Sequence, residues 1–542
     1  MPALEEKTAP PAAPPPEPPK ATPAATTNPY IGILGVFLGA GLATLNARLL
    51  SVGLADLRGA IGLDFDAASW IPTALNMATM FSGVFVVFVN SILGPRRILL
   101  PMAAIFTVAS FFIPFAAPSY WAIVALVVIA GLSSGTFYSL TMTFVLNALP
   151  KKLIIFGIAA YAADIVFVSN FASAIYAWYF DHFSWHWIFW NATLFTPVMM
   201  ICVYYGIPRQ PPTGTMPNWR GFTYFSFGFA LLYGALDQGE RLYWFNSGTI
   251  VAMSAAGIFL VAASAIRHKI LPNPAVSLKF LNRRNIIIFA LSIFVFKFEH
   301  LATVVLVPSF LGNIQHYRNL EIGHALAWIA LPMFVVVWLV AITIVHTNSR
   351  LILAAGFTIC ATTCWVCAHL DSSWYGRSFQ IIELVLAVGF ACSYVGLVSN
   401  LVLEAIEAGA LTSLANSATY SGFMHFIRIF GGQVGVTVMT RFLNVREEFH
   451  SNMLGLNVQA GNWLTDERLR TLTAGFLSSS SSQEEAQQRA LSVLGSQIRG
   501  QAYTMAIADA FVLITWVVAG YLLLMLFLRP GKVNFNMLRK MK

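Results

Sequence analysis

The chain is a succession of long apolar runs separated by short polar segments. A helix that crosses a membrane needs about 20 mostly apolar residues. Runs of this length predict spans near residues 30–54, 68–93, 98–117, 120–147, 152–178, 187–207, 221–237, 248–266, 285–311, 325–346, 350–369, 379–403, 412–440 and 503–528. The pattern therefore predicts an all-α membrane protein with fourteen transmembrane helices.

The composition excludes an ordinary soluble protein. Of the 542 residues, 57% are hydrophobic and only 10% are charged, whereas a soluble domain carries roughly 25% charged residues. The formal net charge is +9, but the basic residues occur singly and in pairs rather than as a dense stripe. Nucleic acid is therefore not expected as a partner.

Lysine and arginine are distributed unevenly between the two sides of the predicted spans. Cytoplasmic loops of membrane proteins carry the excess of these residues. If the N-terminus is cytoplasmic, the short outward loops hold only Arg58, Arg241, Arg318 and Arg377, and most other basic residues fall inside. We therefore expect both termini in the cytoplasm.

Three segments are expected outside the membrane. Residues 1–29 form a Pro/Ala-rich tail that cannot bury a core and should be disordered, and 529–542 form a short cytoplasmic tail. The segment 441–502 is polar and too long for a plain connector, and its Gln/Ala-rich second half is typical of a helix. It is either a docking surface for a partner or a solvated excursion.

Ionisable residues inside the apolar runs are the main functional candidates. Each costs about 3 kcal/mol at the bilayer centre on insertion scales, so each calls for a functional reason. The candidates are Arg48, Asp164, Lys297, Glu299, His300, Glu383 and Arg428, with Asp237 at the outer end of the span at 221–237.

The span at 285–311 concentrates three of these residues. At about 100° per residue, Lys297 and His300 lie on one face of the helix, and Glu299 points to nearly the opposite side. Lys297 and Glu299 therefore cannot easily pair on their own helix. The group is either a substrate or proton site, or two ion pairs to other helices, for instance to Asp164 or Glu383.

Other motifs indicate little chemistry. Cys360, Cys364 and Cys367 have the spacing of an iron–sulfur motif but lie in an apolar helical run, so we interpret them as packing residues. No nucleotide-binding fingerprint and no catalytic constellation is present. We expect no cofactor, no metal, no enzyme and no ATP-driven transport within this chain.

Several stretches together resemble a known family. They are WHWIFWN at 185–191, LDQGE at 236–240 with Trp244 and Phe245, FIRIFGGQVG at 426–435, and the long polar segment that opens with NVREEFH at 444–450. They are similar to the fourteen-span drug:proton antiporter branch of the major facilitator superfamily, the EmrB/QacA group. Asp237, Gly431, Gly432 and Gly435 fall on positions of the family motifs.

The resemblance implies both an architecture and a role. It implies the major facilitator fold, with six-helix bundles at 30–207 and 285–528, two inserted helices at 221–266, and a long periplasmic loop at 441–502. It also implies multidrug-type export across a bacterial inner membrane, within a tripartite pump that includes a periplasmic adaptor and an outer-membrane channel.

The chain departs from the family where proton coupling is thought to occur. Asn46 stands where the first span usually has an acidic residue, and Val127 stands where the fourth usually has arginine. Burial disfavours the charged form of a carboxyl, so other buried acids can bind protons. Asp164, Glu299 and Glu383, together with His300, are the candidates to replace the missing groups.

We therefore expect a secondary transporter that exports amphipathic or aromatic small molecules. Two alternatives stay open. One is a transporter of a single anionic metabolite, in either direction and without the usual proton coupling, in which Arg48, Lys297 and Arg428 bind the anion. The other is a non-transporting sensor or assembly subunit.

Overall fold

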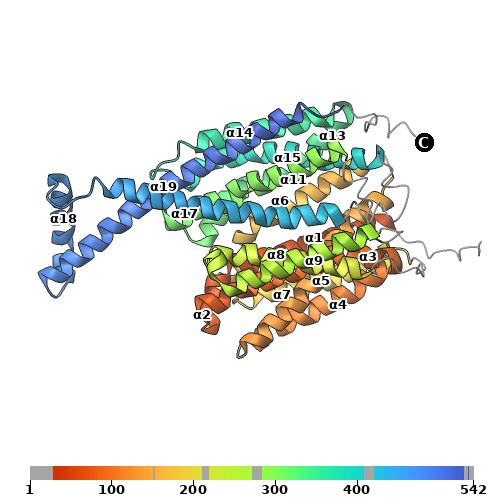
Figure 1. Cartoon of the computed structure of the whole chain (residues 1–542), viewed down its shortest axis with the longest axis horizontal. Helices are drawn as coiled ribbons and strands as arrows, with labels where there is room; N and C mark the ends of the chain where they lie inside the picture. The colour runs from red at the N-terminus through yellow and green to blue at the C-terminus, as the bar shows by residue number, and fades with distance from the viewer. Residues whose placement is uncertain are drawn as a thin grey trace, which may run out of the picture.

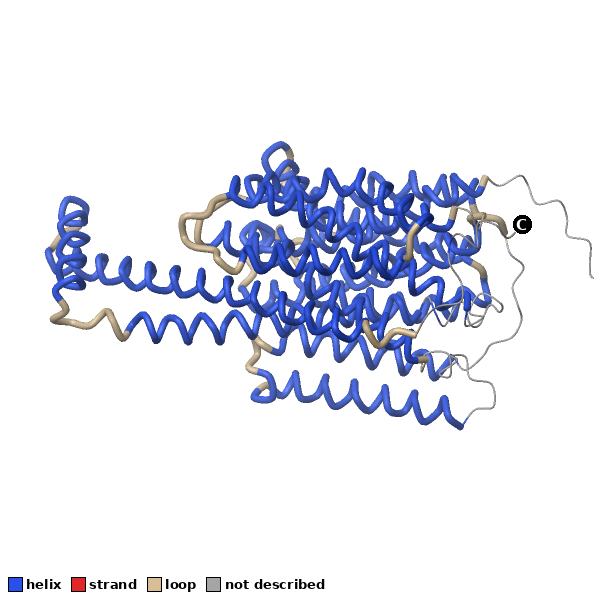
Figure 2. Tube along the Cα trace, turned by 90° about the horizontal axis from the view of Figure 1, so that it is seen from above, coloured by secondary structure: helices blue, strands red, loops and turns tan. Residues whose placement is uncertain are grey.

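The computed structural model describes residues 28–150, 153–209, 219–270, 283–407, 420, 422–529 and 535. Within these ranges the protein is built from helices joined by short loops, with no β-strand (Figures 1 and 2). The predicted tails at 1–29 and 529–542 lie almost wholly outside the described residues. Part of the predicted span at 412–440 does too.

The helices follow the predicted apolar runs closely. The first part of the chain forms α1 (Pro29–Val52), α2 (Leu54–Ile61), α3 (Phe65–Leu93), α4 (Pro95–Phe112), α5 (Tyr120–Ala148), α6 (Ile154–His182) and α7 (Trp187–Gly206). The predicted inserted pair is α8 (Trp219–Gly239) and α9 (Gly248–Ile270). The remainder forms α11 (Arg284–Leu301), α12 (Val307–Asn313), α13 (Asn319–His346), α14 (Ser349–Cys367), α15 (Gly376–Glu407), α17 (Gly432–Gly455), α18 (Trp463–Phe476) and α19 (Gln483–Met525).

Polar residues and glycine mark the helix ends. The Asn28 side chain accepts a hydrogen bond from the Tyr30 N–H at the start of α1, and Asp64 does the same for Ala67 at the start of α3. Such caps satisfy backbone donors that lack a partner within the helix. Gly94, with φ of 79°, makes the sharp turn from α3 to α4, a conformation that L side chains disfavour.

Twelve helices within the described ranges are long and apolar enough to cross a membrane. The two other predicted spans correspond to α8 and to the helix that contains residues 427–455, neither of which is among the twelve. The all-helical architecture is therefore confirmed, whereas the count of fourteen membrane crossings stays a prediction.

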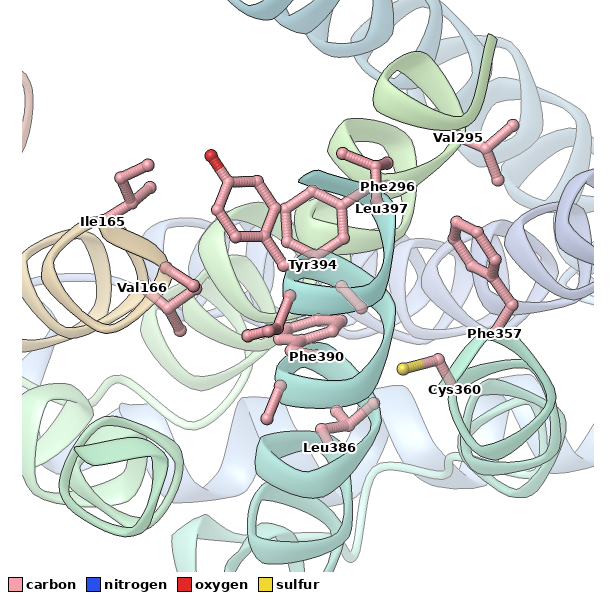
Figure 3. Packing of buried hydrophobic residues seen from close by; sticks show 14 of the residues in the cluster. Ile165, Val166, Val295, Phe296, Phe357, Cys360, Leu386, Phe390, Tyr394 and Leu397 are labelled. Atoms are coloured by element: carbon pink, nitrogen blue, oxygen red, sulfur yellow. The ribbon is translucent and has the colours of Figure 1, made fainter. Parts of the chain in front are cut away.

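Buried apolar side chains form two separate cores. One joins α1, α3, α4, α5 and α7 around large rings such as Phe106, Phe137 and Phe189. The other joins α11 to α15 with α17 and α19, around rings such as Phe357 and Phe390 (Figure 3). The helices of the two halves thus pack mainly among themselves.

Helix α6 forms the principal seam between the halves. It belongs by sequence to the first half, but its buried face packs against α13 and joins the second core. Near one end of this seam, a Cβ atom on Gly323 of α13 would lie only 2.6 Å from the Ala174 backbone of α6. The two helices therefore touch backbone to backbone, which small residues permit.

The polar segment 441–502 is helical over most of its length, including its first half, for which no helix was predicted. Helix α17 continues to Gly455, α18 crosses the tip, and α19 returns from Gln483 as a single helix of 43 residues. The parts of these three helices within residues 441–502 form an extension that projects from one end of the bundle (Figure 1, left). We call it the helical extension. The helical character predicted for its second half is confirmed.

Charged residues connect α17 to α19, and to the loop after α8, at the base of the helical extension. Asp509 of α19 accepts hydrogen bonds from the Arg446 guanidinium at 2.6 Å and lies 2.7 Å from the Nε2 atom of His450, both on α17. The loop after α8 also binds α17, because Glu240 accepts hydrogen bonds from Arg441 and Asn444, each at 3.1 Å.

The Glu240 contacts predict a pH-dependent stability. Burial alone would raise the pKa of Glu240, but hydrogen bonds from Trp244, Asn444 and Arg441 lower it below its ordinary value. A carboxyl with a lowered pKa in the folded state adds stability above its ordinary pKa and loses it as the pH falls through the lowered value.

We therefore expect Glu240→Gln to lower the melting temperature at neutral pH, and this difference from the native chain to vanish between about pH 5 and pH 3. Thermal unfolding of both proteins across this range measures the effect. Glu448→Gln, at an exposed position of α17, is the matched control. A difference that stays constant with pH would contradict the expectation.

Candidate functional site

Four charged side chains from both halves of the protein meet between the two cores. They are Arg48 on α1, Asp164 on α6, Lys297 on α11 and Arg428 on a π-helical turn at Ile427–Gly431. We call them the central charge cluster. Protein surrounds Arg48, Asp164 and Lys297 on all sides, yet each keeps part of its surface uncovered. They therefore border space inside the protein rather than lipid.

Electrostatic interactions connect the members of the cluster. Arg428 is the cation whose field reaches Asp164. Arg428 and Arg48 both act on Lys297, so that Lys297 lies within range of two other positive groups, one of which also acts on Asp164. At membrane depth, where the dielectric constant is low, such interactions are strong.

Direct pairing does not neutralise these charges. Six ion pairs occur among the described residues, and none of them includes a member of the central charge cluster. The Nε atoms of Arg48 and Arg428 and the Oδ2 atom of Asp164 are buried, with no hydrogen-bond partner among the described residues. The interhelical ion pairs that the sequence left open for Lys297 and Glu299 are therefore not found in this part of the chain.

A row of aromatic rings lines the cluster. The Arg428 guanidinium lies over the Tyr138 ring, 3.0 Å from its centroid. Ring centroids are then 5.2 Å apart from Tyr138 to Tyr161, and 6.4 Å apart from Tyr161 to Tyr394. Figure 3 shows Tyr394 beside Phe296, whose ring centroid is 4.6 Å away. The row joins α5 and α6 of one half to α11 and α15 of the other.

Lys297 and His300 share one face of α11, as the helical geometry predicted. His300 is buried and lies within the fields of Lys297 and Arg48. Glu299 points the other way, toward Cys360 of α14. Immediately after His300 the helix passes into a π-helical turn at Ala302–Leu306. Both charged segments of this half, around Lys297 and Arg428, therefore adjoin π-helical turns, which are common at functional sites.

Glu299 and Glu383 form a second buried acidic region, inside the C-terminal half. Both carboxyl groups are fully buried, and among the described residues neither oxygen of Glu383 has a hydrogen-bond partner. The thiols around them belong to Cys360, Cys364 and Cys367 of α14, which act electrostatically with the two acids.

The three cysteines belong to the hydrophobic core, as predicted for packing residues. Within the described ranges no group of three or more His, Cys, Asp or Glu side chains is arranged to hold a metal ion.

The residues at family-motif positions occupy helix contacts. Asn46 is buried on α1, and its side-chain oxygen has no hydrogen-bond partner. Gly432 faces the Lys297 side chain and Gly435 faces Phe298, while Gly431 faces Phe294. A Cβ atom at each glycine would lie 3.6 to 3.8 Å from α11, an ordinary contact distance, so the helix that contains Arg428 packs beside α11 without an approach that requires glycine.

Asp237 lies two residues before the end of α8 at Gly239. It accepts a hydrogen bond from the Thr73 hydroxyl of α3 and one at 2.9 Å from the Gln433 amide of α17. Asp237 therefore connects the inserted helix to both halves of the protein.

Sequence reasoning missed the aromatic residues of the site and His425. Tyr138, Tyr161, Tyr394 and His425 are buried. A Cβ atom on Gly83 of α3 would collide with the His425 ring. The available signal was His425 itself, a polar residue three positions before Arg428 in an apolar run.

Comparison with known proteins agrees with this arrangement. The family model described as "Major Facilitator Superfamily" matches residues 36–426. Over 500 residues the chain is 22% identical to the "Multidrug export protein EmrB" of Haemophilus influenzae, covering 92% of this chain and 95% of that protein. Over 523 residues it is 23% identical to the "Colistin resistance protein EmrB" of Acinetobacter baumannii, covering 92% and 96%.

A solved structure supports the same fold. The human organic anion transporter MFSD10 superposes with a TM-score of 0.53 over 93% of this chain and 100% of its own, at 13% sequence identity. Identity at this level indicates the fold alone. The predicted resemblance to EmrB-type proteins is confirmed by the relatives, and with the family model matched over most of its length the chain belongs to the Major Facilitator Superfamily.

Proposed function

We propose that this protein is a secondary active exporter of amphipathic or aromatic small molecules in the bacterial inner membrane. The observation that carries the proposal is the central charge cluster. A charge at membrane depth costs about 3 kcal/mol on insertion scales, and here Arg48, Asp164, Lys297 and Arg428 take part in none of the six ion pairs among the described residues. Relatives named for multidrug export and colistin resistance support the same role.

The transport cycle that we propose rocks two halves about this cluster. Residues 30–207 and 285–528 form the two bundles, and 221–266 supply the inserted pair. Facilitator-type transporters bind substrate near the bilayer midplane between such halves. The backbone contact between Gly323 and Ala174 on the seam of α6 and α13 is suited to sliding, because it involves small side chains.

We place both termini in the cytoplasm, following the distribution of lysine and arginine. The helical extension then lies in the periplasm. It exposes large apolar side chains, namely Phe449, Met453, Trp463, Leu464 and Leu491, which a partner protein could cover. We propose that it docks a periplasmic adaptor, which leads to an outer-membrane channel.

Three carboxyl groups are our candidates for proton coupling: Asp164, Glu299 and Glu383. At least one oxygen of each is buried without a hydrogen-bond donor, and a buried carboxylate without donors is costly unless it takes a proton. They replace the acid that the family has at the position of Asn46. His300 lies beside Lys297 and is the fourth candidate.

The test is flux in proteoliposomes that contain the purified full-length chain, a pH-sensitive dye inside, and a panel of amphipathic aromatic compounds outside. We expect addition of a transported compound to move protons in the opposite direction. Asp164→Asn, Glu299→Gln and Glu383→Gln should each be compared with Asp181→Asn, which changes an exposed acid at the end of α6.

The outcomes separate the parts of the proposal. Substrate flux without proton flux would contradict proton coupling but leave transport intact. If all three carboxyl variants kept native transport and pH dependence, the assignment of these acids would be wrong. Folded protein that moves no compound of the panel in either direction would contradict the exporter itself.

A further inference from the structure

We propose that the substrate is an organic acid, a carboxylate or similar anion on an aromatic or aliphatic body, whose charged group binds among Arg48, Lys297 and Arg428. This inference rests on the proposed transport function and adds the chemical class of the substrate. Its basis is the composition of the central charge cluster, which contains three cations and only one acid.

The three cations have donors to spare. The Nε atoms of Arg48 and Arg428 are buried without an acceptor, and Lys297 takes part in no ion pair of the described residues. Like charges within range of one another repel, and buried donors without acceptors are unfavourable. A carboxylate relieves both penalties, because its two oxygens accept several hydrogen bonds and a guanidinium can bind both at once.

The surroundings of the cations suit the body of such a molecule. Tyr138, Tyr161 and Tyr394 present a row of rings next to Arg428, and Phe296 continues the row beside Lys297 on α11. Aromatic and aliphatic groups pack well on such rings. A neutral or cationic amphipathic molecule would use the rings but would leave the cations unpaired.

Asp164 allows a test in which removal of a charge should strengthen binding of an anion rather than weaken it. It is the acid within range of Arg428, and its Oδ1 atom lies against α1, 2.7 Å from where a Cβ of Gly41 would be. A bound anion would compete with this carboxylate for Arg428 and would be repelled by it. Glu299 faces Cys360 instead, so it does not compete.

The experiment measures binding to the full-length protein in lipid nanodiscs by calorimetry. The probes are a naphthalene carboxylate, the matching carboxamide and the matching methylammonium, and the same three head groups on a decyl chain. We expect a carboxylate to bind about tenfold more tightly than its amide and its amine, the size expected for a hydrogen bond between charged groups.

Two variants should then move the affinity in opposite directions. Lys297→Met should weaken carboxylate binding about tenfold and leave the amide unchanged, whereas Asp164→Asn should strengthen carboxylate binding. A gain of affinity cannot arise from misfolding, so it protects the test if Lys297→Met is unstable. Lys269→Met, at the exposed end of α9, is the matched control and should bind like the native chain.

The inference is overturned if neither carboxylate binds more tightly than its amide, if the amine is preferred, or if Lys297→Met and Asp164→Asn shift affinity in the same direction. Flux measurements distinguish this from failure of the proposed function. Transport of amines or amides without acid preference would refute the inference and leave export standing. Carboxylates that bind as expected but never cross the membrane would refute export.

Discussion

Replacing Asp237 by alanine is expected to destabilise the junction of α3, α8 and α17 by about 3 kcal/mol, because it removes hydrogen bonds to a charged group and leaves the buried Gln433 amide without this acceptor. The Thr73 hydroxyl loses its bond across the helices and keeps only the Ser69 carbonyl of its own helix as an acceptor. The same junction contains a second contact, in which the Thr437 hydroxyl donates to the Leu236 carbonyl at 3.1 Å. Asp237 is thus the polar centre of a three-helix contact that spans both halves.

This change should affect transport as well as stability, because any movement of α3 relative to α17 must alter this contact. We expect Asp237→Ala to lower the melting temperature and to reduce substrate flux at least tenfold, and Asp237→Asn to recover part of both, since an amide can still accept one of the two hydrogen bonds. Asp181→Ala, an exposed acid of α6, is the control. Native flux in Asp237→Ala would show that the junction has no role in transport.

Replacing Gly356 by valine is expected to prevent correct packing of the C-terminal half. Helices α14 and α15 approach so closely that a Cβ on Gly356 would lie 2.3 Å from the Ser393 backbone nitrogen. Two glycines of α15 complete the contact: a Cβ on Gly389 would lie 2.4 Å from the Cys360 sulfur, and one on Gly396 would lie 3.0 Å from the Leu353 backbone. Backbone atoms cannot move aside as a flexible side chain can.

The expected cost of Gly356→Val exceeds about 3 kcal/mol, the upper end of the usual cost of overpacking. Gel filtration in detergent should show loss of the monodisperse species, and Gly356→Ala should give an intermediate result. Gly520→Val in α19 is the control, because no atom outside its own helix lies within 4 Å of a Cβ at that position. If Gly356→Val folds as well as Gly520→Val, the close approach of α14 and α15 is wrong.

The apolar pattern predicted most of the helices, because in lipid every backbone polar group must be paired inside its own segment. The runs at 98–117 and 350–369 became α4 at Pro95–Phe112 and α14 at Ser349–Cys367. The pattern predicted the helix in the second half of 441–502 but not α18 or the continuation of α17, which are polar helices that project beyond the bundle. Such helices are held by contacts like Arg446 with Asp509, which no hydropathy average reveals.

The candidate charges could also be found without coordinates, because an ionisable residue in an apolar run is conspicuous. Their grouping could not. Sequence alone left open whether Lys297 and Glu299 form a substrate or proton site or pair with charges on other helices. In the structure Glu299 faces Cys360 of α14. The role of the tyrosines could not be predicted for a different reason. Tyr138 and Tyr161 are ordinary residues of apolar spans, and only the packing of α5, α6 and α15 brings their rings together with that of Tyr394.

What the residue pattern by itself determined is therefore the class: a helical membrane protein with charges at membrane depth. The facilitator fold was implied by the resemblance of short motifs to a known family. Composition and helical periodicity are properties of neighbouring residues, so they can be evaluated without knowledge of the fold. Only the tertiary structure decided that Arg48, Lys297 and Arg428 share one region with Asp164 while Glu299 and Glu383 lie in another. That division depends on which helix faces meet across the seam between the two halves, and contacts between residues hundreds of positions apart are not encoded in any local pattern.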